Sequence, residues 1–528
     1  MFEGNIMLKT EFFADYLSDE SRTVGFADSI SFPENEEEIR GIIRQCYEKN
    51  CRVTVQGGRT GLAAGAVPFG GHIMNLSRMN RVTGMAQRDG VFYLTVQSGV
   101  VLRELRKAIA ARRFDTADWS RESLDALAAF RESGEQMFVP DPTETSAAIG
   151  GMAACNASGA RTHGYGPTRN YIERVRVVLS DGDVIEVRRG DVFAEGRRMI
   201  LSTLDGRVIE ADLPTYVMPE TKNASGYYAA DNMDAVDLFV GSDGTLGVLS
   251  ELELRLIPMP GVIWGTTCFF ESEEQAAVFT DTLRRTDVNE VSLEYFDERA
   301  LEILRIQKAE KAAFAALPDI PDGAGAAVYV ELHCDNEEEA AGKLFRLGEV
   351  LTAAGGDEEN TWVARTENDR DRLLFFRHAV PESVNMLIDE RKKTCPAITK
   401  LGSDMSVPDN RLFDVIRLYR TTLREEGLEA AVWGHIGENH LHVNILPRNE
   451  EEYVRGKEVF IRWAGEVTAM GGAVSAEHGI GKLKAPFLRI MYGEDHIQEM
   501  AALKQAFDGR SILGMGNLFS EETGVRKS

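Results

Sequence analysis

The sequence predicts an α+β fold with more than one domain. A chain of 528 residues is too long for a single hydrophobic core, so two or three domains are expected. The first half combines short strands with three stretches of glycine and other small residues. In the second half, strands alternate with amphipathic helices, which is typical of an antiparallel sheet with helices on one face.

Composition and charge exclude several classes of function. The chain is 43% hydrophobic and 27% charged, as in ordinary globular proteins, and its formal net charge is −25. Nucleic-acid binding is not expected, because it relies on basic side chains that neutralise phosphates. The six cysteines show no C-x-x-C spacing, which excludes the usual iron–sulfur motifs. No signal peptide and no membrane-spanning run are found, so we expect a cytoplasmic protein.

The chain divides where its pattern changes. Pro258 and Pro260 close an alternating strand at 252–256 and mark the main boundary. We expect a helical N-terminal extension at 1–31, a first domain at 32–260, a second at 261–508 and a tail at 509–528. Periodicity predicts helices at 36–50, 101–112, 272–285, 337–354 and 410–426, and strands at 53–56, 72–76, 92–96, 175–179, 265–270 and 326–333. Residues 188–235 are polar and irregular, and we expect a flap there.

The first small-residue stretch follows the strand at 53–56 and contains Gly57, Gly58, Arg59, Thr60 and Gly61. Glycine costs conformational entropy, so this cluster needs a structural reason. A bare backbone can approach a ligand closely and direct its N–H groups at negative charge. We interpret the loop as a site for the pyrophosphate of a dinucleotide, with a simple turn as the alternative. Two further small-residue stretches follow at 140–159 and 239–249.

The densest polar cluster lies at 434–445. If the segment from His440 onward is a strand, His440, His442 and Asn444 share one face. His435 lies in the preceding glycine turn and can curl back towards that face. Converging imidazoles suit a transition metal such as Zn²⁺, whereas a polar strand face at a domain edge is the alternative.

A second cluster, at 475–482, places Glu477 beside His478. Together they can supply a carboxylate ligand and a general base near neutral pH. The stretch is not a phosphate-binding Walker loop, because Ala476 and Leu483 occupy positions where that motif needs glycine and a hydroxyl residue. Upstream, Arg377 and Lys400 are cations that can hold an acidic substrate, although isolated cations are usually solvated.

Together these motifs resemble the vanillyl-alcohol-oxidase/p-cresol-methylhydroxylase superfamily of FAD enzymes. The similarity runs from about residue 32 to residue 519 and is to the branch of D-lactate dehydrogenase, glycolate oxidase flavoprotein subunit and D-2-hydroxyglutarate dehydrogenase. It implies a two-subdomain FAD-binding domain of the p-cresol methylhydroxylase (PCMH) type, an α+β cap domain with an antiparallel sheet, and a C-terminal segment that returns to the flavin.

The resemblance also implies roles for individual residues. The matching FAD contacts are Gly57, Gly58, Arg59, Thr60, Gly61, Pro142, Ser146, Gly150, Gly151, Asn156, Gly159, Thr168, Gly241, Gly244, Thr245, Val248 and Asn517. The matching metal ligands are His435, His442 and Glu477, with zinc as first choice. His478 matches the catalytic base, and Arg377, Lys400 and Asn444 match substrate contacts.

Some residues depart from the family pattern. Asp243 stands where glutamate is frequent, and His440 stands where asparagine is usual. Asn517 is followed by Leu-Phe instead of the usual Pro-Gly-Lys, and Pro381 lies one turn after Arg377, where a relative has a hydroxyl. The first loop contains no histidine to which FAD could be tethered, so we expect non-covalent FAD.

The implied activity is the oxidation of a small D-2-hydroxy acid, with D-lactate first and glycolate or D-2-hydroxyglutarate as alternatives. Electrons would pass to an iron–sulfur partner, an electron-transfer flavoprotein or a quinone, and a homodimer is one assembly considered. Two other classes stay open from the residues themselves: a metal-dependent hydrolase and a flavin-binding subunit without turnover. Ether-lipid synthesis, a non-redox activity of the superfamily, is a remoter alternative.

Overall fold

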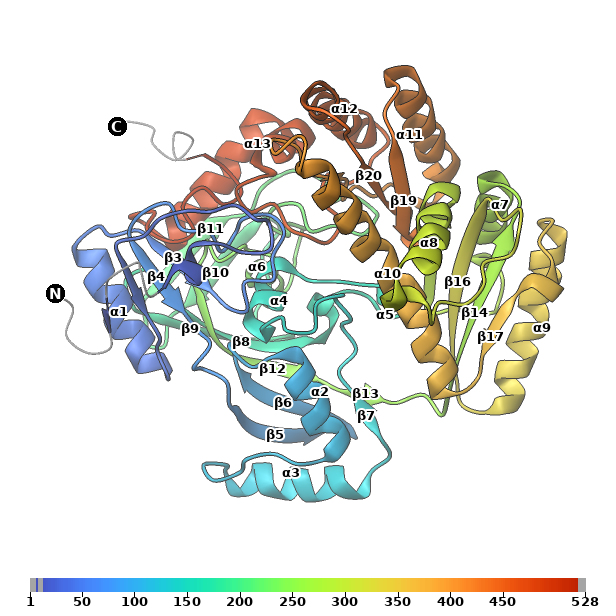
Figure 1. Ribbon diagram of the computed structural model, residues 1–528. Coiled ribbons are helices and arrows are strands. Elements are labelled where there is room, and N and C mark those ends of the chain that lie inside the picture. The colour runs from blue at the N-terminus through green and yellow to red at the C-terminus, as the bar shows by residue number, and fades with distance from the viewer. Residues whose placement is uncertain (1–5, 8–12, 521–528) are drawn as a thin grey trace.

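The computed structural model describes residues 6–7 and 13–520 (Figure 1). The N-terminal half, drawn in blue to green, contains two main sheets, and a seven-stranded sheet with its helices forms the other side of the molecule. We call this seven-stranded sheet and its helices the cap. The long last helix, α13 (Ala485–Phe507), lies against the N-terminal half beside β11 (Val208–Asp212). Among the described residues, no helix is long and apolar enough to cross a bilayer.

The first sheet has the order β1-β2-β4-β3, built from Ile6–Met7, Ser29–Ser31, His72–Asn75 and Val53–Gln56. Helix α1 (Glu36–Glu48) buries Ile39, Ile43 and Cys46 against it, as the periodicity predicts. The expected helical extension is wrong within the described residues, because residues 13–31 hold one 3-10 turn (Ala14–Leu17) and strand β2. β2 runs parallel to β4, so this segment belongs to the sheet.

The second sheet has the order β5-β6-β12-β8-β9, built from Val82–Arg88, Val91–Gln97, Val248–Arg255, Ile172–Val178 and Val184–Arg188. Helices α2 (Leu102–Ala111) and α3 (Arg121–Glu132) pack their apolar faces into the same core. The short helices α4 (Ile149–Cys155), α5 (Thr162–Tyr165) and α6 (Val236–Phe239) come from or border the small-residue stretches.

The expected irregular flap at 188–235 contains a regular hairpin. Strands β10 (Arg198–Ser202) and β11 pair antiparallel in full register. Each alternates exposed and buried residues, with Met199 and Leu201 facing Ile209 and Ala211 in the core. Burial with a period of two is typical of a half-buried strand, but the exposed apolar residues Ile200 and Val208 interrupt this alternation in the sequence.

The cap sheet is antiparallel and has the order β17-β14-β16-β15-β19-β20-β18. Its strands are Trp362–Ala364, Val262–Phe270, Ala326–Cys334, Ser292–Asp297, Ala430–His435, His440–Ile445 and Leu401–Gly402. Short β13 (Ile257–Pro258) pairs with β7 (Gln136–Met137) at the boundary marked by Pro258. We propose 32–260 and 261–508 as the domain limits on either side of it.

Helices cover both faces of the cap sheet, which corrects the expectation of one covered face. One face packs on α7 (Glu273–Leu283), α9 (Glu337–Ala353), α11 (Leu412–Glu426) and α12 (Glu450–Ala469). The other packs on α8 (Glu298–Glu310) and α10 (Glu367–Lys392), through Leu301 and Phe376. The inner strand β16 is buried at every position, as strands covered on both faces are.

Candidate active site

The three small-residue stretches meet in space. A Cβ atom on Gly58 would lie 2.7 Å from the carbonyl oxygen of Ser146, so the first loop touches the second stretch with bare backbone. The third stretch joins them, because Gly241 N donates to Ala153 O at 2.9 Å and Asp243 N donates to Ala154 O at 2.8 Å. The predicted FAD contacts therefore form one continuous surface, although the chain separates them by nearly 190 residues.

The glycines of this surface serve two different purposes. Gly150 and Gly159 have neighbours so close that an added Cβ would collide with Ser98 Cβ at 2.5 Å and with Asp141 O at 1.7 Å. In contrast, a Cβ on Gly61, Gly151 or Gly244 would meet no atom within 4 Å. The first pair lets the second stretch pack closely on Ser98 and on its own first residues, and the second set leaves open space beside the stretches, as the close approach of a ligand requires.

The other predicted FAD residues fix the backbone around this surface. Thr168 donates its hydroxyl to Ala157 O at 2.6 Å, and the Asn156 side chain accepts from the N–H of Arg169 at 3.0 Å. The Thr245 hydroxyl lies 2.6 Å from that of Tyr227. The structure also places Gly57 against Ala148, Pro142 beside Gly159, and Val248 in β12; Arg59 stacks on Tyr16, and Thr60 lies half-buried between Arg59 and Gly61.

The C-terminal tail returns to the first loop. Asn517 donates to Gly65 O at 3.2 Å and to Asp243 O at 3.0 Å, which places it where the sequence predicts. Lys482 Nζ donates to Asn517 Oδ1 at 2.8 Å and to Gly65 O at 3.3 Å. Burial lowers the pKa of Lys482 to about 8. Sequence reasoning missed this contact of Lys482. The tail of this chain lacks the lysine that usually follows the asparagine in the family, and Lys482 contacts Asn517 from another loop.

The predicted histidine cluster forms at the polar end of one cap face. His440, His442 and Asn444 lie on one side of β20, while Leu441, Val443 and Ile445 enter the core on the other, as predicted. His435 ends β19 opposite His440, so it reaches the same face from a strand and not from a glycine turn. One ligand atom from each of His435, His440, His442 and Glu477 lies within 4.8 Å of all the others.

Second-layer contacts orient two of these imidazoles. His435 Nδ1 donates to Glu294 Oε1 at 2.6 Å, and His435 Nε2 lies 3.2 Å from Glu477 Oε2. His442 Nδ1 donates to Ser403 O at 3.1 Å, which leaves His442 Nε2, 3.7 Å from Glu477 Oε1, as the lone-pair nitrogen. Metal-binding histidines show this arrangement, in which the outer nitrogen donates and the inner one binds the ion.

The charge around the cluster also suits a cation. Four buried carboxylates face three permanent cations; the carboxylates are Glu294, Asp404, Glu438 and Glu477, and the cations are Lys222, Arg377 and Lys484. Glu477 Oε2 is buried without a well-aligned hydrogen bond, although Lys222 Nζ lies 2.9 Å away. Burial opposes protonation of His435, but Glu294 and Glu477 outweigh it and raise the pKa of His435 to about 9, so the cluster attracts positive charge. The donor set and this attraction fit a divalent metal.

Burial and neighbouring charges set the protonation of the cluster. Burial opposes ionisation of Glu477, but Lys222 and His435 outweigh it and hold its pKa well below the usual range. Burial lowers the pKa of His440 to about 4 and that of His442 well below its ordinary value. Burial also lowers the pKa of His478, against the attraction of Asp404. His478 is therefore neutral at pH 7, as a general base needs to be.

His478 lies between the cluster and the FAD surface. Its Nδ1 lies 3.6 Å from Asp404 Oδ2 and its Nε2 lies 3.7 Å from Glu477 Oε1. Its ring stacks on His442 with centroids 5.5 Å apart. Three residues later, Gly481 N donates to Asp243 Oδ2 at 2.9 Å, which ties this loop to the third small-residue stretch.

Sequence reasoning missed Asp404, Lys222 and Glu294. Asp404 is fully buried and accepts from the backbone N–H groups of Glu477 and His478 at 3.2 and 3.1 Å. Each of the three is a single residue in an unremarkable context. No local pattern could have identified them, because the cap fold brings them to the cluster from distant parts of the chain.

The predicted substrate contacts have different positions. Arg377, on α10, pairs through Nε with Glu294 Oε2 at 3.2 Å and so lies directly behind His435. Asn444 is buried in the strand of the cluster, and its amide donates to His442 O at 3.0 Å. Lys400 is half-buried next to β18, whose Gly402 pairs with Asn444. Burial and Arg22 lower the pKa of Lys400 to about 8.

Two further arginines considered for a dicarboxylate already have partners. Arg169 pairs with Asp237 at 3.1 Å and donates to Val240 O, so it is part of the first domain's framework. Arg161 pairs with Glu331 at 2.7 Å. Neither guanidinium is therefore available as an uncompensated charge for a second carboxylate.

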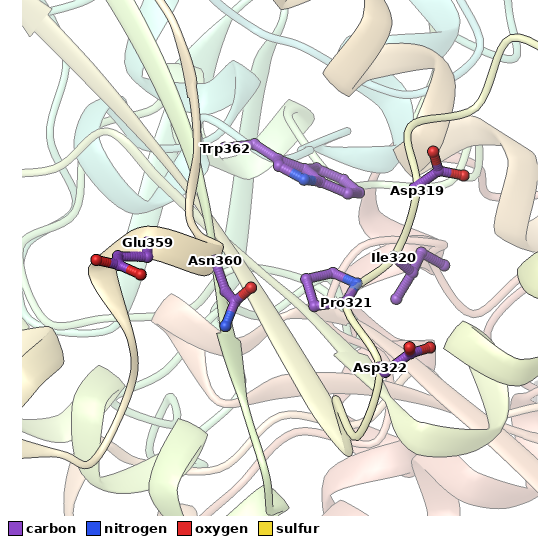
Figure 2. Close-up of a pocket in the computed structure, with 7 residues that line it drawn as sticks. All are labelled: Asp319, Ile320, Pro321, Asp322, Glu359, Asn360 and Trp362. Carbon is purple, nitrogen blue, oxygen red and sulfur yellow. The ribbon is translucent and has the colours of Figure 1, made fainter.

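A separate open pocket lies in the cap beside β17 (Figure 2). Figure 2 shows its lining residues, which are Asp319, Ile320, Pro321, Asp322, Glu359, Asn360 and Trp362. It is lined by three carboxylates but by no histidine and no cation. None of the predicted site residues contributes to it, and we assign it no part in the reaction.

Comparisons with known proteins agree with this architecture. The family model of the FAD binding domain matches residues 27–121 and 122–188, and that of the C-terminal domain of FAD linked oxidases matches residues 265–518. A D-lactate dehydrogenase of Anaerostipes hadrus is 26% identical, over 97% of this chain and 94% of the relative. Glycolate oxidase subunit GlcD of Bacillus subtilis (strain 168) is 25% identical, over 94% and 90%.

The fold also has solved counterparts. The structure of p-cresol methylhydroxylase with substrate bound matches with a TM-score of 0.67 at 14% identity, covering 99% of this chain and 94% of that chain. The two family models together cover most of the sequence in the order in which the FAD surface and the cap occur. The chain thus belongs to the FAD-linked oxidases, with a PCMH-type FAD-binding domain followed by the C-terminal domain of that family.

Proposed function

We propose that the protein oxidises a small D-2-hydroxy acid, with D-lactate as first choice, to the 2-oxo acid. One observation carries the proposal: the loop of Glu477 and His478 contacts both the histidine cluster and Asp243 of the FAD surface. The proposed binding sites for the hydroxy acid and for FAD are thereby held next to each other. The similarity to a D-lactate dehydrogenase and to a glycolate oxidase subunit supports this substrate class.

The chain's own residues would divide the work as follows. His435, His442 and Glu477 would hold a divalent metal, zinc in the first instance, which when bound supplies Lewis-acid polarisation of the substrate hydroxyl. His478 Nε2 accepts the hydroxyl proton, and Asp404 beside Nδ1 stabilises the imidazolium that results. Arg377, Lys400 and Asn444 hold the carboxylate. The three small-residue stretches would hold FAD without a covalent bond, and the bound flavin would supply the hydride acceptor for the α-hydrogen.

A monocarboxylate is the first choice, in line with the similarity to a D-lactate dehydrogenase. Glycolate and D-2-hydroxyglutarate are the next candidates, since they share the carboxylate–hydroxyl head. The electrons would pass from reduced FAD to an iron–sulfur partner, an electron-transfer flavoprotein or a quinone. A cytoplasmic location is part of the same proposal.

Anaerobic reduction of the bound flavin tests the proposal. D-lactate, glycolate, D-2-hydroxyglutarate and the L-enantiomers are mixed with the oxidised protein, and loss of the flavin absorption is followed. We expect D-lactate to bleach the flavin fastest and the L-acids to leave it oxidised. His478→Ala should abolish bleaching while retaining FAD, whereas His496→Gln, on α13 outside the cluster, should bleach normally. Failure of every D-acid would refute the proposal.

A further inference from the structure

The histidine cluster contains one imidazole more than the three proposed ligands require. His440 is fully buried, and neither of its ring nitrogens has a well-aligned hydrogen bond. A buried polar atom without a partner is destabilising, so a residue of this kind calls for an explanation. The family that this chain resembles usually has asparagine at this position, and asparagine lacks the imidazole nitrogen with which His440 could bind a metal.

The position of the His440 ring indicates which nitrogen is available. Nε2 lies 3.0 Å from Oδ1 of Asp404, whose carboxylate pairs with Lys484 and accepts from the backbone N–H groups of Glu477 and His478. That carboxylate can only accept, so the proton of the neutral ring belongs on Nε2. Nδ1 then carries the lone pair, and it lies 3.9 Å from Glu477 Oε2 inside the cluster.

This is the same arrangement that orients the two neighbouring imidazoles. Glu294 receives the outer N–H of His435, and Ser403 O receives that of His442. Asp404 stands in the corresponding place behind His440. Carboxylates and carbonyls behind the rings orient metal-binding histidines, so the inner nitrogens of all three rings lie towards Glu477, where an ion would bind.

The distances are compatible with a single ion. Bonds from Zn²⁺ to imidazole nitrogen or carboxylate oxygen are about 2.0–2.2 Å, so two donors on one ion can be at most about 4.3 Å apart. The separations from Glu477 oxygens are 3.2 Å to His435, 3.7 Å to His442 and 3.9 Å to His440, all below that limit. The rings of His440 and His442 are also close, with centroids 4.3 Å apart.

We propose that His440 Nδ1 is a fourth protein ligand, so that His435, His440, His442 and Glu477 hold one divalent ion. The inference rests on the proposed metal site and adds a ligand to it. Four protein donors close the coordination of a tetrahedral ion, as in structural zinc sites. For the substrate to bind directly, the ion has to accept more than four donors, which favours ions of higher coordination number.

Metal affinity tests the fourth ligand without reference to turnover. The holoenzyme is stripped with chelator and titrated with Co²⁺ against a competing chromophoric chelator, for wild type, His440→Asn and His333→Asn. His333 is the matched control, because it is a buried cap histidine with a carboxylate, Glu331, 2.9 Å from Nε2 and lies outside the cluster. We expect His440→Asn to weaken Co²⁺ binding by about 100-fold or more. Loss of a residue that only hydrogen-bonds to a ligand weakens metal binding by up to about 100-fold, and loss of a ligand should cost at least as much. The control should bind as wild type does.

A second measurement needs no variant. Pulsed electron paramagnetic resonance of the Cu²⁺-loaded wild type counts the imidazoles bound to the ion, and we expect three. A count of two, or a Co²⁺ affinity of His440→Asn equal to that of the control, would overturn the fourth ligand while the three-ligand site stands. If the wild type binds neither ion at the cluster, the proposed metal site itself fails, and the two outcomes are thus distinguishable.

Discussion

Glu294 is the residue whose substitution probes the outer layer of the cluster. Its carboxylate accepts from His435 Nδ1 at 2.6 Å and pairs with Arg377 Nε at 3.2 Å, and its side chain is 4% exposed. Glu294→Gln keeps the shape and removes the charge. His435 can then still find an acceptor, but its orientation and basicity are no longer enforced by an anion.

The size of the effect follows from these contacts. Loss of an outer-layer partner lowers metal affinity by about 10–100-fold, equivalent to about 1.4–2.7 kcal/mol. The Arg377 guanidinium would also lose its nearest anion in a buried place. Breaking a buried pair in this way costs about 3–5 kcal/mol, and the amide oxygen of glutamine offsets part of that loss.

Two measurements on the same protein separate these effects. Competition with a chelator gives the metal affinity, and thermal unfolding of the metal-free protein gives the stability. The matched control is Glu290→Gln, because Glu290 is a buried cap carboxylate 3.1 Å from His163 and outside the cluster. We expect both variants to lower the unfolding temperature and only Glu294→Gln to weaken metal binding. Equal metal affinity in both variants would refute an outer-layer role for Glu294.

Three further predictions concern the FAD surface, the substrate contacts and the first sheet. Gly58→Ala places a Cβ 2.7 Å from Ser146 O, so we expect a lower flavin-to-protein absorbance ratio; Gly41→Ala, in α1 with nothing within 4 Å, should retain FAD and gain about 1 kcal/mol in stability. Because the pKa of Lys400 is about 8 and only its charged form attracts a carboxylate, KM for D-lactate should rise as pH passes about 8, and this rise should disappear in Lys400→Met. Burial lowers the pKa of His72 to about 4. Between pH 6.5 and 4 the unfolded chain therefore binds the proton first, and the free energy of unfolding falls by about 3 kcal/mol at most. Urea unfolding at stepwise pH, with His72→Asn for comparison, measures this fall.

Each of these predictions has a contrary outcome. Full flavin content in Gly58→Ala would mean that the first loop does not depend on close contact with the second stretch. A KM that is flat between pH 7 and 9 would remove Lys400 from the substrate site. An acid stability profile of His72→Asn that coincides with wild type would show that His72 does not contribute to acid sensitivity.

Local patterns predicted the parts of the site that are contiguous in the chain. The alternation of His440, His442 and Asn444 with apolar neighbours fixed their common face, and the structure confirms it. The glycine loop after β3 was likewise predicted from the sequence, because a strand followed by several glycines indicates a close approach of the backbone to another group. Most helix boundaries agree within a few residues, as for α9, whose Asn336 N-cap accepts from Glu339 N.

The remainder depends on tertiary contacts. Asp404 and Glu294 have no local signal, because their role arises only when β15 and the segment after β18 reach the histidines. The second covered face of the cap sheet was missed although β16 is apolar at nearly every position, a pattern typical of strands buried on both faces. The hairpin of β10 and β11 was missed because the exposed positions Ile200 and Val208 are apolar and interrupt the alternation in the sequence.

The most direct test of the central claim joins the metal cluster to the flavin. Enzyme with FAD bound is stripped of metal, mixed anaerobically with D-lactate in a rapid-mixing spectrophotometer, and then assayed again after metal is restored. We predict that the flavin of the stripped enzyme stays oxidised and that restored metal recovers its reduction, but not in His442→Ala. Equally fast reduction with and without metal, in both proteins, would contradict the claim that the histidine cluster and FAD form one active site.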